Sequence, residues 1–260
     1  MDSTDKYNWF YKLMIKLFSI SEEQRYGRKE VVEIAKSYLE NKDSAVVVDV
    51  AAGQGTDLIA INNNCMGNVE LYALEAYMPN IIHLQTNNIK TFQVNLERDK
   101  LPFPDSSVDI IVANQILEHC KELFWITSEF SRILKPEGIV IVGVPNLASL
   151  HCRALLLFGK QPICIETHGP HVRGFTYSDL KYFFEDGNYF NVKKRFGSGF
   201  YSIIPQFAPF LAKIMPSLAV SMVMEVERTE KKGLFIENLN NCFYETNYYV
   251  GEDKETSYKN

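Results

Sequence analysis

The chain has 260 residues, a hydrophobic fraction of 46% and a formal net charge of -5 at pH 7. This length suits one large α/β domain or two small ones, and the acidic balance argues against a general nucleic-acid partner, which favours a basic surface. The five cysteines are odd in number and form no Cys-x-x-Cys pair, which argues against a disulfide framework or zinc site and favours a cytoplasmic, reducing compartment.

Residues 1–44 are expected to form N-terminal helices. One face of the first helix would gather the apolar side chains Trp9, Phe10, Leu13, Met14, Leu17 and Phe18. That face fits a helix packed on the domain, a lid over an active site or a membrane-surface helix. Lys12 and Lys16 interrupt this stretch, so neither a signal peptide nor a transmembrane segment is expected. A second helix is expected over Arg28–Leu39.

From residue 45 onward, strand-like and helix-like segments alternate. The expected strands are 45–50, 69–75, 91–95, 108–113 and 138–144, and the expected helices follow Gly55, surround 79–86 and span 121–134. This alternation predicts an α/β fold, in which a mostly parallel sheet is covered by helices on both faces. Ligands of such sheets bind beyond the carboxyl ends of the strands.

The segment 46–55 is the most informative part of the chain. An apolar, β-branched run reaches Asp49 and then breaks into a turn with Gly53 and Gly55, after which a helix begins. Glycines allow close backbone approach to a ligand, and the helix N-terminus presents free N–H groups. The second strand ends at Glu75, a carboxylate that suits the ribose hydroxyls of an adenosine ligand.

The glycine turn is not a dinucleotide fingerprint, because Leu58 stands where the third glycine would be, and no Walker lysine follows. It resembles motif I of the class I S-adenosylmethionine-dependent methyltransferases. Four further blocks resemble the same family in the same order: 101–109, 114–119, 132–138 and 139–142. The resemblance covers roughly residues 45–145.

The resemblance implies S-adenosylmethionine as the cofactor and assigns it eight residues: Asp49, Ala51, Gly53, Gly55, Glu75, Asn95, Leu96 and Asn114. The glycine turn and Asp49 would lie at the amino-acid end of the cofactor, and Glu75 would bind the ribose. Asn95 and Leu96 match the position that contacts adenine, although many members have Asp where this chain has Asn95. Ala51 replaces a common glycine. A family member that no longer binds the cofactor stays an alternative.

The family's sheet closes with an antiparallel strand pair, which residues 191–203 and 218–228 can supply, giving a Rossmann-like sheet of seven strands. The expected division is 1–44, a methyltransferase domain over 45–228 with an acceptor-pocket insertion at about 146–190, and a C-terminal extension over 229–260. Within the insertion, we expect a helix over Leu147–Phe158, a loop over 159–174 and a helix over Tyr177–Glu185 capped by Thr176. The extension would pack on the body or on a second subunit, so a homodimer is one expectation.

Four residues are candidates for the acceptor site. His119 follows the fourth strand, and His168, His171 and Arg173 crowd a glycine-flanked loop after the fifth strand, the region that builds the acceptor pocket in this fold. His171 or His119 could be the general base, while His168 and Arg173 would bind the substrate, for which an arginine favours phosphate or carboxylate. The alternatives are a solvated loop for 166–175 and a packing role for His119.

No metal is expected at this place. In some related O-methyltransferases, a Glu-x-x-Glu-His sequence binds a divalent metal, but here the first carboxylate is replaced by Gln115 in the run Gln115–His119. The expected function is methyl transfer from S-adenosylmethionine to a small molecule or glycan, at oxygen. The alternatives are an N-methyltransferase acting on an amine or protein, and a binding subunit that keeps the fold without turnover.

Overall fold

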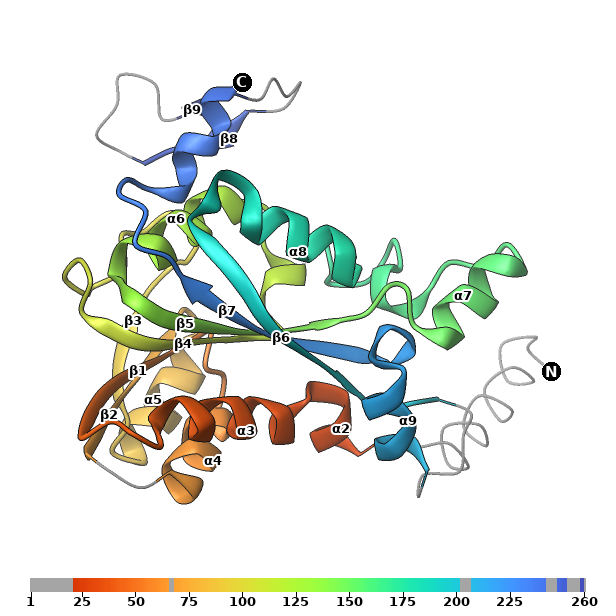
Figure 1. Cartoon of the computed structure of the whole chain (residues 1–260), viewed down its shortest axis with the longest axis horizontal. Helices are drawn as coiled ribbons and strands as arrows, with labels where there is room; N and C mark the ends of the chain where they lie inside the picture. The colour runs from red at the N-terminus through yellow and green to blue at the C-terminus, as the bar shows by residue number, and fades with distance from the viewer. Residues whose placement is uncertain (1–20, 66–67, 202–206, 242–246, 252–257, 260) are drawn as a thin grey trace.

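A computed structural model describes residues 21–65, 68–201, 207–241, 247–251 and 258–259. Its centre is one seven-stranded sheet with the order β3-β2-β1-β4-β5-β7-β6 (Figure 1). The strands are β1 (Ser44–Val50), β2 (Asn68–Glu75), β3 (Lys90–Gln93), β4 (Val108–Asn114), β5 (Leu134–Pro145), β6 (Phe190–Ser198) and β7 (Ser221–Arg228). The first five strands are parallel, and β7 pairs antiparallel with both β5 and β6. The predicted fold class, including the closing antiparallel pair, is confirmed.

Helices cover both faces of the sheet. They are α2 (Glu22–Tyr26), α3 (Arg28–Leu39), α4 (Thr56–Asn64), α5 (Met78–Thr86), α6 (Leu123–Ile133), α7 (Leu150–Leu157), α8 (Tyr177–Glu185) and α9 (Ala208–Ile214). Short 3-10 turns add η1 (Leu117–His119), η2 (Ile163–Ile165), η3 (Asp186–Asn188), η4 (Pro216–Leu218) and η5 (Phe235–Asn241). The first segment, residues 1–20, lies outside the described residues, so the predicted first helix stays untested.

Two apolar cores form because alternate side chains of each strand point to opposite faces. On one face, Val47, Ile110 and Ile141 pack with α3 and α4. On the other face, Val48 and Ile111 pack with α6 and α8. Figure 1 shows α3, α4 and α5 below the sheet and α6 and α8 above it. The site therefore stands on a sheet that is buried from both sides.

β6 ends at Ser198 rather than residue 203, and most other predicted strand ends differ from the structure by one to three residues. Two further differences have an identifiable cause. β3 ends at Gln93 rather than residue 95, because the backbone N–H of Asn95 donates to the Asp99 carboxylate (2.7 Å) and starts a turn. β5 begins at Leu134 rather than 138, since Leu134 already pairs with Val108 ahead of a register shift. Both differences come from contacts between residues that local sequence patterns do not reveal.

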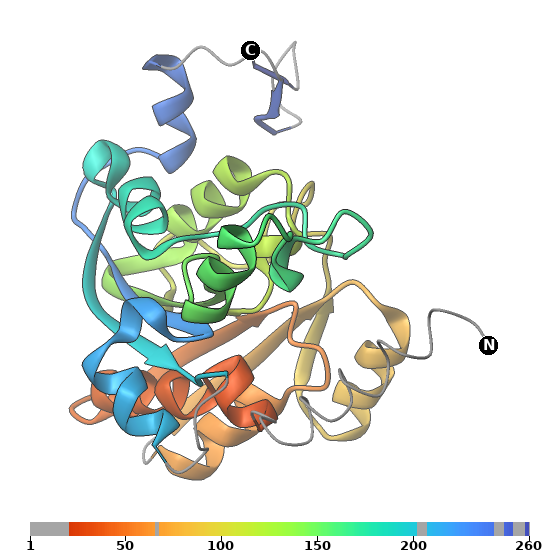
Figure 2. The same ribbon diagram turned by 90° about the vertical axis from the view of Figure 1, so that its right-hand side faces the viewer.

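The segment between β5 and β6 contains the predicted acceptor insertion. Helix α7 is shorter than predicted, at Leu150–Leu157, whereas α8 spans the predicted residues. The Thr176 hydroxyl caps α8 by accepting from the Asp179 N–H (3.3 Å). In the turned view of Figure 2, this segment (green to teal) lies on the side that faces the viewer.

The described part of the C-terminal extension lies on the side of α6 and α8, with β8 (Tyr248–Tyr249) and β9 (Tyr258–Lys259) beyond η5 (Figure 1, Figure 2). Phe235 is fully buried there, against Phe124 and Phe183. The division at residues 44 and 228 stays a prediction. No helix among the described residues combines the length and apolar character that crossing a membrane requires.

Candidate functional site

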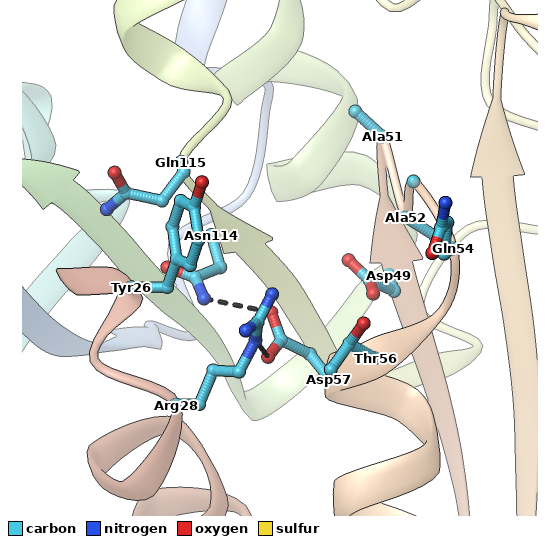
Figure 3. Close-up of a pocket in the computed structure, with 11 residues that line it drawn as sticks. Tyr26, Arg28, Asp49, Ala51, Ala52, Gln54, Thr56, Asp57, Asn114 and Gln115 are labelled. Atoms are coloured by element: carbon cyan, nitrogen blue, oxygen red, sulfur yellow. Dashed lines mark hydrogen bonds and ion pairs between the residues drawn. The ribbon is translucent and has the colours of Figure 1, made fainter. Parts of the chain in front are cut away.

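A pocket opens at the carboxyl ends of the neighbouring strands β1 and β4 (Figure 3). The strands β2 and β3 follow on one side of β1, whereas β4 and β5 follow on its other side, so the strand order reverses between β1 and β4. This reversal is the place at which open α/β sheets bind their ligands. The pocket is lined by Tyr26, Arg28, Asp49, Ala51, Ala52, Gly53, Gln54, Thr56, Asp57, Asn114 and Gln115. Four of the eight residues predicted to bind the cofactor are among them: Asp49, Ala51, Gly53 and Asn114.

The turn after β1 has three residues with left-handed backbone: Ala51 (φ 56°), Gly53 (φ 56°) and Gly55 (φ 76°). A Cβ atom on Gly53 would meet nothing within 4 Å, so a side chain there would occupy open space beside the pocket. A Cβ on Gly55 would lie 2.7 Å from Leu84 and 2.9 Å from Ile89. The missing side chain of Gly55 thus leaves room for Leu84 of α5 and for Ile89, whereas Gly53 lines the pocket.

Glu75 holds the glycine turn in place from the end of β2. One of its carboxylate oxygens accepts from the Gly53 N–H (2.8 Å), and the other accepts from the N–H groups of Ala76 (2.8 Å) and Tyr77 (2.9 Å). These bonds fix the carboxylate next to the turn, although Glu75 does not itself line the pocket. A role in ribose binding stays a prediction.

Acidic side chains dominate the electrostatics of the pocket. Burial, followed by the nearby charges of Asp57 and Glu75, raises the pKa of Asp49 well above its usual range, and Arg28 only partly opposes this. Burial also raises the pKa of Asp57, against hydrogen bonds from Asn114 and Arg28. Two carboxylates, Asp49 and Asp57, and one guanidinium therefore line one small space, and the charge of Glu75 acts on Asp49 from outside it, which favours a ligand that brings positive charge.

Asn114 and Gln115 form the wall from β4. The Asn114 side-chain amide donates to Asp57 (2.8 Å), while its carbonyl oxygen is buried without a partner. A Cβ on Gly143 of the neighbouring strand would lie 2.0 Å from that oxygen, so only glycine leaves room for it. Gln115 adopts the left-handed region (φ 58°), the second such non-glycine residue at the pocket after Ala51. Strain of this kind gathers at functional sites.

Seven lining residues were not predicted to bind the cofactor: Tyr26, Arg28, Ala52, Gln54, Thr56, Asp57 and Gln115. Gly27 (φ 62°) ends α2 and starts α3, and its missing side chain leaves room for Val223, which a Cβ would approach to 2.5 Å. This corner carries Tyr26 and Arg28 to the mouth of the pocket (Figure 3). A Tyr-Gly-Arg corner directly before a predicted helix was the available signal, and Asp57 in the first turn of α4 was another.

Asn95 and Leu96 do not line the pocket. The Asn95 side-chain oxygen accepts from the Glu97 N–H (3.0 Å), and Leu96 belongs to the apolar core. Their assignment to adenine binding stays a prediction.

The predicted acceptor residues His119 and His171 come together. Their rings lie edge to face with centroids 4.6 Å apart, and the Val172 N–H donates to the Glu118 carbonyl (2.8 Å), which joins the loop to η1. Burial and the neighbouring His171 lower the pKa of His119, while a hydrogen bond to the Pro170 carbonyl acts in the opposite direction. Burial raises the pKa of Glu118 to about 8. Glu118 is part of this cluster, although the sequence analysis gave it no role.

The other two predicted acceptor residues lie apart from the histidine pair. His168 is exposed, and Arg173 donates from its guanidinium to the Lys121 carbonyl (2.8 Å), which ties the loop to the segment before α6. Substrate binding by either residue stays a prediction.

Residues 48–142 match a family model described as a methyltransferase domain. A probable S-adenosylmethionine-dependent methyltransferase from Mycobacterium tuberculosis is 31% identical over 96 residues, which cover 36% of this chain and 32% of that protein. Another from Mycolicibacterium smegmatis is 43% identical over 47 residues, 18% of each protein. The chain thus spans about a third of the length of the first curated relatives that it matches.

Solved structures share the fold. A methyltransferase from Archaeoglobus fulgidus has a TM-score of 0.53 at 14% identity, covering 84% of this chain and 100% of that chain. A Burkholderia thailandensis 1,6-didemethyltoxoflavin-N1-methyltransferase, solved with its acceptor and S-adenosylhomocysteine, has a TM-score of 0.52 at 15% identity and covers 78% of both chains. At such identities the likeness establishes the Rossmann-like architecture and nothing about the acceptor.

Proposed function

We propose that this protein, whose residues 48–142 belong to the class I S-adenosylmethionine-dependent methyltransferases, transfers a methyl group from that cofactor to an oxygen of a small molecule or glycan. The observation that carries the proposal is the charge arrangement of the pocket at the ends of β1 and β4. S-adenosylmethionine brings a sulfonium, an ammonium and a carboxylate, and the pocket offers a group of opposite charge for each kind.

Asp49 and Asp57 suit the two cationic groups of the cofactor, and Arg28 suits its carboxylate. Two buried carboxylates whose pKa values are raised become easier to ionise when a cation binds beside them. Gly53 presents backbone and open space where the amino-acid end would lie. Glu75, held at the end of β2, would accept from the ribose hydroxyls.

The His119–His171 pair would handle the proton of the acceptor. In the transfer, the bond between the methyl carbon and the sulfonium sulfur breaks as the carbon bonds to the acceptor oxygen, and the hydroxyl proton must leave. His171 Nδ1 lies 2.8 Å from the Cys164 carbonyl, which can only accept, so Nδ1 bears the hydrogen and Nε2 keeps a lone pair. That nitrogen can serve as the general base.

The acceptor class is argued from the charge on the histidine loop. Arg173, on the same loop as His171, would favour an acceptor with a phosphate or carboxylate group. The four described cysteines are free thiols, which supports a reducing, cytoplasmic setting. A homodimer stays part of the proposal through the C-terminal extension. N-methylation of an amine or protein is the competing activity, because a neutral amine needs no base.

Two measurements test the proposal. Isothermal titration should detect binding of S-adenosylmethionine. If no binding is found, the remaining alternative is a subunit that keeps this fold without turnover. Activated sugars and anionic metabolites, screened for S-adenosylhomocysteine release, should then reveal an acceptor. With that acceptor, His171→Ala should lower turnover by roughly 10²–10⁴-fold while cofactor affinity stays nearly unchanged. Full turnover in both His171→Ala and His119→Ala would contradict O-methylation and would favour methyl transfer to an amine.

A further inference from the structure

We propose that Glu118, His119 and His171 bind a divalent transition-metal ion beside the cofactor pocket. One ligand atom from each side chain lies within 4.8 Å of the others, although the residues come from η1 and from a loop more than fifty positions later in the chain. Two imidazoles and one carboxylate form a donor set that suits zinc, iron and related first-row ions. The metal site itself does not depend on the proposed function, whereas the role of the ion in the reaction rests on it.

Glu118 is the residue that points to a ligand. It is 1% exposed, and neither carboxylate oxygen has a hydrogen-bond partner. Its Oε1 lies 4.0 Å from His119 Nε2, so the carboxylate is directed at the histidine pair. A buried carboxylate without donors is costly, and a cation supplies what it lacks. Two other buried acids have such partners: Glu129 pairs with Arg132 and Asp109 with Lys135.

The surroundings of the histidines resemble the support that metal ligands receive. Ligating histidines usually donate their second ring N–H to a backbone carbonyl or carboxylate, which fixes the tautomer and the ring. His171 donates from Nδ1 to the Cys164 carbonyl (2.8 Å), and the Pro170 backbone lies near enough to His119 to act on its pKa. For His171 this leaves Nε2 as the free lone pair. The His171 ring is thus oriented by a backbone group, and both rings remain at least partly accessible.

The spacing requires only a small closure. Metal–nitrogen and metal–oxygen bonds of about 2.0–2.2 Å place two tetrahedral ligand atoms about 3.4 Å apart. The ligand atoms, at up to 4.8 Å, would move together by roughly one ångström. His119 lies on a three-residue 3-10 turn and is exposed, so its side chain can make that adjustment.

The sequence disfavoured a metal because Gln115 replaces the first carboxylate of a known local pattern. The third ligand proposed here, His171, comes from the acceptor loop, and the Val172–Glu118 backbone hydrogen bond holds that loop against η1. Three protein ligands leave a coordination position open. In the proposed reaction, an acceptor hydroxyl at that position would lose its proton more readily, and His171 would act as a ligand rather than as the base.

Titration of the metal-free full-length chain with Co²⁺ tests the site without any methyl acceptor, since the visible absorption of bound Co²⁺ reports its ligands. We expect about one equivalent to bind and Zn²⁺ to displace it. Glu118→Gln, His119→Ala and His171→Ala should each weaken binding at least tenfold. His168→Ala is the matched control, a histidine of the same loop outside the cluster, and should bind as the native chain does.

The result that would overturn the site is the absence of saturable Co²⁺ or Zn²⁺ binding at millimolar concentrations, or equal loss in His168→Ala. If Glu118→Gln does not fold, the two histidine variants decide, because both side chains are partly exposed. Titration with S-adenosylmethionine separates this proposal from the proposed function. Binding of Co²⁺ through these residues without binding of the cofactor would support the metal site and contradict the methyltransferase assignment. Binding of the cofactor without binding of Co²⁺ would support the methyltransferase assignment and contradict the metal site.

Discussion

Arg28 Nε lies 3.3 Å from Asp57 Oδ1 and thereby joins the start of α3 to the first turn of α4 across the mouth of the pocket (Figure 3). The other Asp57 oxygen accepts from Asn114 on β4. One carboxylate therefore links three elements around the proposed amino-acid end of the cofactor. Its guanidinium partner is the only positive side chain among the described lining residues.

Replacement of this guanidinium should weaken cofactor binding. Hydrogen bonds to charged groups contribute about 1.5–3 kcal/mol, so Arg28→Gln should raise the Kd for S-adenosylmethionine by roughly 10–100-fold. Arg25→Gln is the matched control, since this exposed arginine on α2 makes the same change of charge a few residues away. Calorimetric titration measures the Kd of both variants. An equal loss of affinity in the two would show that overall charge, and not a contact of Arg28, causes the effect.

Gly53 should tolerate no β-branched side chain when the cofactor binds. Its φ of 56° is strained for valine, and the added atoms would extend into the open space beside the pocket. Gly53→Val should abolish detectable binding of S-adenosylmethionine. Gly159→Val is the control, since it imposes comparable strain at an exposed position (φ 66°) that also has open space around its Cβ. This variant should lose stability but still bind S-adenosylmethionine. Normal binding by Gly53→Val would mean that the cofactor lies elsewhere.

The sheet and the glycine turn could be predicted because local patterns encode them. The β-branched run before Asp49 is typical of a buried strand, and the turn with Gly53 and Gly55 follows from backbone freedom. Residues placed by tertiary contacts could not be found in this way. Arg28 reaches the pocket through the Gly27 corner, and Glu118 meets His171 only because the acceptor loop folds back onto η1.

The two glycines of the turn differ in what surrounds them. Gly55 belongs to the same motif as Gly53, yet its missing side chain makes room for Leu84 and Ile89 rather than for a ligand. Conversely, Ala51 adopts the left-handed backbone (φ 56°) that explains why glycine is common at this position. Sequence identifies which residues permit a turn, whereas only the structure separates those that pack from those that line the pocket.

Asp49 should make the cofactor-free protein less stable as pH rises. Its folded pKa lies above the ordinary 3.8, so above that value the folded state holds a proton that the unfolded state releases. Stability therefore falls with rising pH until the folded group ionises, by roughly 1.4 kcal/mol for each unit of pKa elevation. Asp49→Asn should remove this slope while weakening S-adenosylmethionine binding. Urea unfolding from pH 4 to pH 8 compares the two proteins, and parallel curves would contradict the prediction.

Arg132, within one of the family-like blocks, should matter for folding rather than for chemistry. It lies in the last turn of α6, buried against the segment entering β4, and it donates to Glu129 (2.8 Å), Asp105 (2.9 Å) and the carbonyls of Leu101 (2.9 Å) and Phe103 (2.8 Å). Removal of one partner of a buried pair leaves the other charge uncompensated, so Arg132→Met should cost about 3–5 kcal/mol of unfolding free energy.

Two further variants make the Arg132 prediction specific. Arg132→Met combined with Glu129→Gln should recover part of the loss, because no buried charge then remains unpaired. Arg153→Met changes an exposed arginine that bonds to the Ala148 carbonyl, and it should stay within about 0.5 kcal/mol of the native chain. Urea denaturation measures all three free energies. If the double variant is no more stable than Arg132→Met, the unpaired charge of Glu129 is not the cause of the loss. The loss would then come from the missing contacts of the Arg132 side chain itself.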